Sequence, residues 1–180
     1  MVWPYLLRTL AITRSNRVWA MDISCIPMAR GFVYLAAVSD WHRRRVLAWR
    51  LSISMDTAFC TEAVEEAIAK YSTPEILNTD QGSQVHQQLV HRLAARTRHP
   101  YLEGRQGLCW RDNMFIEDLW LSIEYEEVYL HGYKTESAAR EGIGRYINFY
   151  NTRRPHSSHQ ARTPDMGYFT PLLLPSAEAA

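Results

Sequence analysis

Three acidic residues of this chain lie in surroundings that suit metal-ion chemistry. Asp22 interrupts one apolar run, Asp80 ends another, and Glu117 falls on a predicted helix. A carboxylate inside a buried strand is unfavourable unless a positive group meets it, and hard cations such as Mg²⁺ prefer oxygen ligands. Two such ions can clamp the attacking and the leaving oxygen of a phosphodiester. If the three carboxylates converge, they could therefore hold metal ions for phosphoryl transfer.

Each of the three residues also has an ordinary explanation when it is taken alone. Asp22 could lie on an edge strand, Asp80 in a turn, and Glu117 on the solvated face of a helix. Asp22 fits its ordinary explanation least well, because residues 18–27 around it are mostly apolar. The elements that carry the three residues, and the motifs around them, therefore decide between the two interpretations.

Asp22 falls in the first of three predicted strands, over residues 17–26, 32–38 and 45–53. Each of these runs is largely apolar, which indicates strands that are buried on both faces. The links between them are short and contain turn residues. Links of this length favour an antiparallel meander.

The periodicity then changes to that of a helix, followed by a short strand over residues 75–78 that leads to Asp80. Asp56 or Thr57 could cap the start of the helix. A strand–helix–strand unit favours parallel pairing, and loops at the carboxyl ends of parallel strands are common ligand sites. The residues that share the apolar face of the helix at i, i+3, i+4, i+7 and i+8 are Cys60, Ala63, Val64, Ala67 and Ile68.

Glu117 belongs to a second set of elements that is mainly helical. A helix is predicted over residues 87–96, and a loop with two glycines covers 101–112. The helix that carries Glu117 follows this loop. A further helix is predicted over about 137–150, and its apolar positions repeat with helical spacing.

Composition limits the classes of protein to which the chain can belong. A length of 180 residues suggests one domain with a substantial core. The net charge of +1 argues against a strongly basic nucleic-acid-binding protein, so any DNA contact must be a local patch. The three cysteines lack metal-ligand spacing, which fits a reducing, cytoplasmic setting. No segment has the pattern of a membrane span or a signal peptide.

Four short motifs occur in a fixed order, over residues 19–23, 78–84, 110–117 and 150–156. They read Trp-Ala-Met-Asp-Ile, Asn-Thr-Asp-Gln-Gly-Ser-Gln, Trp-Arg-Asp-Asn-Met-Phe-Ile-Glu and Tyr-Asn-Thr-Arg-Arg-Pro-His. This order closely resembles the catalytic core of insertion-sequence transposases of the DDE family, which are related to retroviral integrases. The resemblance covers nearly the whole chain.

The resemblance implies an α/β fold of the ribonuclease-H-like class, with a mixed sheet of about five strands flanked by helices. The catalytic core would occupy residues 17–165, after an irregular lead-in over 1–16 and before a C-terminal tail over 166–180. Such proteins also have an upstream helical region that recognises transposon ends, and this chain begins just before the core. We expect that an upstream protein or region supplies that function.

The resemblance also implies the chemistry of the site. Asp22, Asp80 and Glu117 match the three DDE carboxylates, which hold two Mg²⁺ or Mn²⁺ ions. The implied reaction is hydrolytic nicking at transposon ends, followed by attack of the freed 3′-hydroxyl on target DNA. The implied partners are DNA and further copies of the chain assembled on DNA, and the implied location is the bacterial cytoplasm, at the nucleoid.

Several polar residues are candidates for DNA contact, each with a plainer alternative. The two glutamines after Asp80 could hydrogen-bond DNA or serve a turn, and the arginines of the turn over residues 42–45 could be solvated. Asn113 could cap the helix that carries Glu117, and the segment after Tyr150 could pack against the core. The candidates are Arg43, Arg44, Gln81, Gln84, Asn113 and Arg154.

The chain departs from the family pattern in three places. Between Asp80 and Glu117 lie 36 residues, one more than is usual. Relatives carry basic residues where Leu121 and Glu124 stand, and a leucine where His159 stands. These departures keep one alternative open, an inactive remnant that retains the fold and binds DNA weakly. A nuclease acting on RNA–DNA hybrids would follow from fold analogy alone, and the four motifs argue against it.

Overall fold

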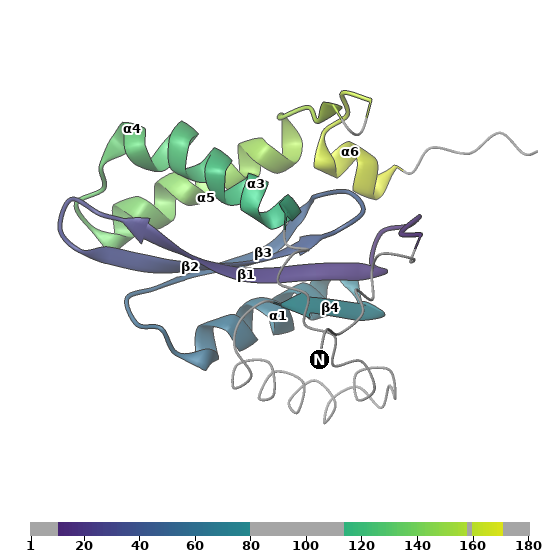
Figure 1. Ribbon diagram of the computed structural model, residues 1–180, viewed down its shortest axis with the longest axis horizontal. Coiled ribbons are helices and arrows are strands. Elements are labelled where there is room, and N and C mark those ends of the chain that lie inside the picture. Colours follow the sequence, from purple (N-terminus) through teal and green to yellow (C-terminus); the bar gives the residue numbers. More distant parts are fainter. Residues whose placement is uncertain (1–10, 80–113, 158–159, 171–180) are drawn as a thin grey trace, which may run out of the picture.

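The computed structural model describes residues 11–79, 114–157 and 160–170, and its centre is a sheet of four strands in the order β3-β2-β1-β4 (Figure 1). The strands are β1 (Val18–Pro27), β2 (Phe32–Asp40), β3 (Val46–Ser52) and β4 (Ile76–Thr79). β1, β2 and β3 pair antiparallel, and β4 pairs parallel with β1. The predicted meander and the parallel pairing are both confirmed. Four of the roughly five expected strands lie within the described residues.

One face of the sheet is covered by α1 (Thr57–Tyr71), which connects β3 to β4. Asp56 is its N-cap, and its side chain accepts hydrogen bonds from the backbone N–H groups of Ala58 and Phe59. The predicted apolar face of this helix packs on the side of β1 that presents Trp19 and Met21. A helix of this length gives the crossover that a parallel strand pair requires.

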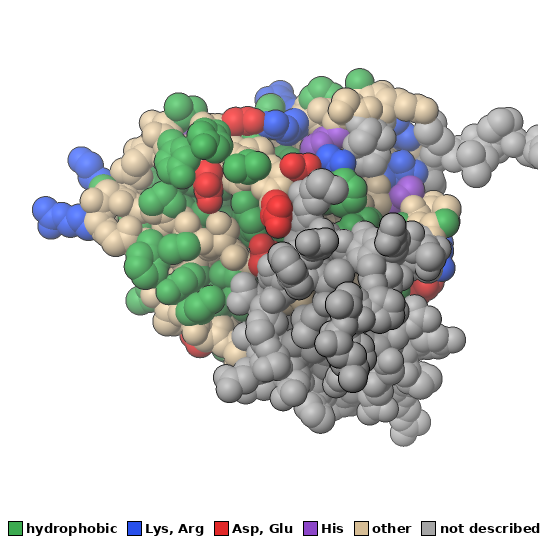
Figure 2. All heavy atoms as spheres, in the orientation of Figure 1, with side chains coloured by type: hydrophobic (Ala, Val, Ile, Leu, Met, Phe, Trp, Pro, Cys, Tyr) green, Lys and Arg blue, Asp and Glu red, His purple; other side chains and the backbone are tan. Residues whose placement is uncertain are grey.

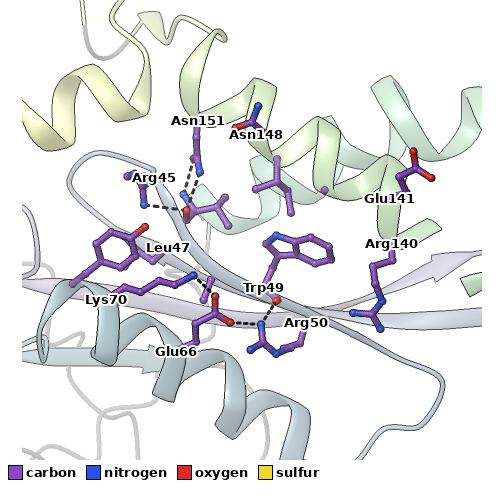
Figure 3. Close-up of a pocket in the computed structure, with 15 residues that line it drawn as sticks. Arg45, Leu47, Trp49, Arg50, Glu66, Lys70, Arg140, Glu141, Asn148 and Asn151 are labelled. Atoms are coloured by element: carbon purple, nitrogen blue, oxygen red, sulfur yellow. Dashed lines mark hydrogen bonds and ion pairs between the residues drawn. The ribbon is translucent and has the colours of Figure 1, made fainter. Parts of the chain in front are cut away.

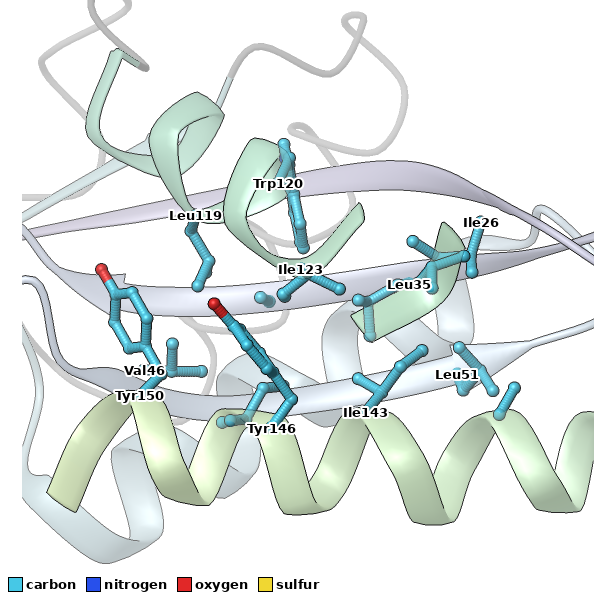
Figure 4. Close-up of a cluster of buried hydrophobic side chains, with 14 of the residues drawn as sticks. Ile26, Leu35, Val46, Leu51, Leu119, Trp120, Ile123, Ile143, Tyr146 and Tyr150 are labelled. Atoms are coloured by element: carbon cyan, nitrogen blue, oxygen red, sulfur yellow. The ribbon is translucent and has the colours of Figure 1, made fainter. Parts of the chain in front are cut away.

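The opposite face is covered by a layer of helices, visible above the sheet in Figure 1. They are α3 (Met114–Ile123), the π-helical turn η1 (Glu124–Val128), α4 (Tyr129–His131), α5 (Glu136–Thr152) and α6 (Pro164–Phe169). The main core lies between this layer and the sheet, where Leu119, Ile123 and Ile143 meet Leu35 and Val46 (Figure 4). The fold is therefore three layers: helix, sheet, helices.

The first three of these helices follow one another directly. The tighter α-helical pattern of α3 widens to a π turn at η1 and returns at α4. The three elements form one continuous helical rod over residues 114–131. Gly132, at φ +51°, ends this rod in the left-handed conformation that glycine tolerates best. The π turn changes the direction in which downstream side chains point, which sequence periodicity did not indicate.

The basic turn before β3 has a structural role. Arg45 is largely buried, with its Nε 2.6 Å from Oδ1 of Asp165 and its guanidinium against the rings of Tyr71, Tyr168 and Phe169. It thereby fixes α6, a short helix in a region where the sequence pattern is weak.

No helix among the described residues has the length and apolarity that a membrane crossing requires.

Candidate functional site

Asp22 lies in the middle of β1 and faces the helical layer. Successive side chains of a strand alternate between its two faces. Ala20 and Ile26 are an even number of residues from Asp22, so they lie on the same face of β1, and both belong to the core beneath α3 and α5. The Asp22 side chain is only 7% exposed. Its Oδ2 accepts a hydrogen bond of 2.8 Å from the indole Nε1 of Trp120. A neutral donor of the protein therefore meets this carboxylate.

Trp120 connects Asp22 to the helix that carries Glu117. Glu117 and Trp120 are three residues apart on α3, and residues at this spacing are neighbours on a helix surface. Trp120 points inward to β1, whereas Glu117 is exposed. On the face shown in Figure 2, acidic side chains gather where α3 lies over β1. Two of the three predicted carboxylates are thus carried by elements that contact each other directly.

The third carboxylate, Asp80, lies outside the described residues, as do Gln81, Gln84 and Asn113. β4 ends at Thr79, whose partner in β1 is Met21. The described residues contain no group of three His, Cys, Asp or Glu side chains that could hold a metal ion. Asp22 and Glu117 supply two carboxylates, whose oxygens are the donor type that Mg²⁺ and Mn²⁺ accept.

Glu117, Leu121 and Glu124 are spaced i, i+4 and i+7, which would put them on one stripe of a regular helix, but this stripe does not face solvent uniformly. Leu121 is 52% exposed. Glu124 is half-buried, and its Oε1 accepts a hydrogen bond of 3.3 Å from Ser24 Oγ, two residues after Asp22 on β1. Of these two departures from the family pattern, Leu121 therefore faces solvent, whereas Glu124 is held against the strand.

The described arginines among the predicted DNA contacts all pack against the protein. The Arg43 side chain lies on Gly167 of α6. The Arg44 guanidinium lies 4.3 Å from the ring centre of Phe115, and its Nη1 is 3.8 Å from Oδ2 of Asp118. The basic turn is therefore packed against α3 and α6, and it is not the solvated turn that was its plainer alternative.

Arg154 also makes intramolecular contacts. Its Nη1 pairs with the Glu126 carboxylate and donates a hydrogen bond of 2.9 Å to the Tyr146 hydroxyl. The hydrogen bond from Arg154 is the largest cause of the lowered pKa of Glu126. The segment after Tyr150 is therefore packed against the core, as its plainer alternative predicted.

A pocket of about 480 Å³ adjoins α3 on the side away from β1, and its lining includes Arg44, Asp118, Leu121, Tyr150, Arg154 and His156. Burial and the two arginines lower the pKa of the His156 imidazole. Since both arginines are already paired with carboxylates, the pocket has little net charge to offer a phosphate. Its importance is that it borders the exposed face of Leu121.

A second concavity, of about 550 Å³, runs along β3 between α1 and α5 (Figure 3). The Asn151 side chain brackets Val46 there, accepting from its N–H at 3.0 Å and donating to its C=O at 2.9 Å. Glu66 pairs with Arg50 and Lys70 on the other wall. Neither Asp22 nor Glu117 lines this concavity, so it is separate from the candidate site.

Sequence reasoning missed Trp120 as a partner of Asp22. Two signals could have found it. A buried indole N–H needs an acceptor, and Trp120 lies one helical turn after Glu117, on the same predicted helix. The sequence alone does not show that Trp120 and Asp22, which are far apart along the chain, contact each other in the fold.

Comparison with known families covers most of the chain. Two family profiles, each described as Integrase core domain, match residues 12–100 and 105–164. The chain is 29% identical over 159 residues to the transposase for insertion sequence element IS904 of Lactococcus lactis, covering 84% of this chain and 61% of that protein. It is 28% identical over 148 residues to the transposase InsF for insertion sequence IS3A of Escherichia coli, covering 79% of this chain and 50% of that protein. The chain thus spans a little over half the length of such relatives.

Solved structures resemble it in fold. An intasome chain of simian T-cell lymphotropic virus, in complex with PP2A regulatory subunit B56 gamma, superposes with a TM-score of 0.66 at 17% identity, covering 98% of this chain and 64% of that one. The HTLV-2 integrase catalytic core domain in complex with magnesium superposes with a TM-score of 0.58 at 16% identity, covering 88% of this chain and 98% of that one. The predicted ribonuclease-H-like α/β fold is confirmed. The two profile matches, which together cover most of the chain, show that it belongs to the integrase core domain family.

Proposed function

We propose that this chain is the catalytic domain of a DDE-type transposase, which nicks DNA and transfers the freed strand in the presence of Mg²⁺ or Mn²⁺. Its substrates would be transposon ends and target DNA, on which copies of the chain assemble in the cell's nucleoid. The observation that carries the proposal is the hydrogen bond between Trp120 and Asp22, because it fixes the Glu117 helix against the strand that bears the first carboxylate.

The strand register supports the third member of the site. In the parallel pair, Met21 lies opposite Thr79. Asp22 follows Met21 in β1, and Asp80 follows Thr79 in the sequence, so a register continued by one position would bring their backbones side by side. The three carboxylates would then come from β1, from the end of β4 and from α3, all at one end of the β1–β4 pair.

The chemistry follows from these roles. Asp22, Asp80 and Glu117 would hold two divalent ions, which activate the attacking oxygen and neutralise charge on the leaving oxygen. In nicking, water attacks phosphorus, the P–O3′ bond breaks, and the water's proton is lost as the 3′-oxygen gains one. In strand transfer, the 3′-hydroxyl attacks a target phosphodiester in the same way. No protein side chain has to act as nucleophile.

A nicking assay on supercoiled DNA tests the proposal. The wild-type chain should nick with Mg²⁺ or Mn²⁺, and Asp22→Asn, Asp80→Asn and Glu117→Gln should each abolish nicking. Asp118→Asn is the matched control, because Asp118 is the exposed neighbour of Glu117 on the same helix and lines the pocket on the other side. Its nicking should equal that of the wild type.

Two results would count against the proposal. Nicking that survives Asp22→Asn would place the chemistry elsewhere. A wild-type chain that stays folded and inactive with both metals, even when supplied with transposon-end DNA, would favour the inactive remnant.

A further inference from the structure

The contact between Trp120 and Asp22 joins two residues that are far apart in the sequence and buried together. Trp120 is 7% exposed and belongs to the core beneath α3 (Figure 4). Its ring is therefore held by packing as well as by its hydrogen bond. The indole has one donor and no acceptor, so its N–H can approach Asp22 only as a donor.

This donor has a directional effect on the carboxylate. It engages Oδ2 of Asp22 at 2.8 Å, which fixes the rotation of the carboxylate about its Cβ–Cγ bond. The Oδ1 atom is then held in one orientation, and the Oδ2 atom keeps one lone pair free of the indole, so both oxygens can still bind a metal ion. A metal ligand that is already oriented loses less freedom when it binds an ion, which is why hydrogen-bonded partners of ligating carboxylates affect metal affinity.

We propose that Trp120 is a positioning residue, whose indole N–H sets the orientation of the Asp22 carboxylate for metal binding. This inference rests on the proposed function, in which Asp22 is a metal ligand. Trp120 also couples the two halves of the site, because it is anchored on the helix that presents Glu117. A displacement of α3 from the sheet would release Asp22 and move Glu117 together.

A purely structural role for Trp120 is the alternative, and the chain contains a matched control for it. Trp19 is a second buried tryptophan, and it lies on β1 itself. Its Nε1 donates a hydrogen bond of 3.0 Å to Oδ1 of Asn16. Its ring packs on the α1 face of the sheet, away from Asp22. Trp19→Phe and Trp120→Phe therefore each remove one buried, bonded indole N–H and keep an aromatic ring.

The test is calorimetric titration of the folded, metal-free full chain with Mn²⁺, beside thermal unfolding of each variant. Both Trp→Phe variants should lower the melting temperature. Trp120→Phe should weaken Mn²⁺ binding by about 10- to 100-fold, and Trp19→Phe should leave it unchanged. Equal Mn²⁺ affinity in Trp120→Phe and the wild type would overturn the inference, as would equal losses in the two variants.

Asp22→Asn, titrated in parallel, separates the inference from the proposed function. If Asp22→Asn binds Mn²⁺ like the wild type, the proposed metal site itself is wrong. If it loses binding while Trp120→Phe does not, only the role of Trp120 is wrong. Should Trp120→Phe fail to fold, the wild-type indole ¹⁵N–¹H signals decide: Mg²⁺ should shift the Trp120 signal and leave that of Trp19 in place, and an unmoved Trp120 signal refutes the inference.

Discussion

Replacing Leu121 by arginine should strengthen DNA binding if Glu117 lies beside the scissile phosphate. Leu121 is 52% exposed and one helical turn beyond Glu117, about 6 Å along the helix axis. The wild-type chain should bind weakly, because Leu121 offers nothing to a phosphate. A pair between the new guanidinium and Glu117 is worth only about 0.2–0.5 kcal/mol, less than the roughly 1.5–3 kcal/mol of a hydrogen bond to a charged group. Contact with phosphate should therefore prevail.

The measurement is a salt titration of binding to duplex DNA by the wild type, Leu121→Arg and Leu130→Arg. Each phosphate contact steepens the dependence of log K on log salt by about 0.9. Leu130→Arg is the control, because it adds the same charge at a leucine that is 71% exposed farther along the same helical rod. Only Leu121→Arg should steepen the slope. Equal slopes in all three proteins would show that this face of α3 does not meet DNA, and would refute the placement of Glu117.

Three further predictions concern metal, packing and thiol reactivity. At about 100-fold excess over its dissociation constant, Mg²⁺ should stabilise the fold by roughly 2.7 kcal/mol in thermal unfolding, and Asp22→Asn should remove this gain. Gly142→Ala should destabilise the fold by about 1–3 kcal/mol in urea unfolding, because the added Cβ would lie 1.8 Å from the Tyr133 hydroxyl; a net gain would contradict that packing. Burial raises the pKa of the Cys60 thiol to about 12, so at pH 8 iodoacetamide should label exposed Cys25 and spare Cys60 until the chain is unfolded.

The sheet and α1 could be predicted because local patterns dictate them. Apolar runs with short links specify the meander, and the change to helical spacing after Asp56 specifies the crossover. The contexts of Asp22 and Glu117 were also informative, since each lies on the kind of element that was predicted. These inferences need only neighbours along the chain.

The rest depends on contacts between distant residues. The π turn at Glu124–Val128 has no local sequence signal, and the bond from Ser24 to Glu124 joins residues 100 positions apart. The arginine turn shows the same limit, because Arg45 is indistinguishable from a solvated arginine until α6 is seen packed on it. Tertiary packing decides such positions, and local propensity does not.

The short parallel pair between β1 and β4 has a consequence for folding kinetics. The meander closes through turns of a few residues, whereas β4 must return to β1 from beyond α1. A loop roughly tenfold longer costs about 2 kcal/mol more in closure entropy, and β4 recovers this through only four paired residues. We expect the meander to form early and β4 to dock late, as non-local pairings generally do. The proposed carboxylate site would then be among the last features to assemble, so partly folded chains would be unable to cut DNA.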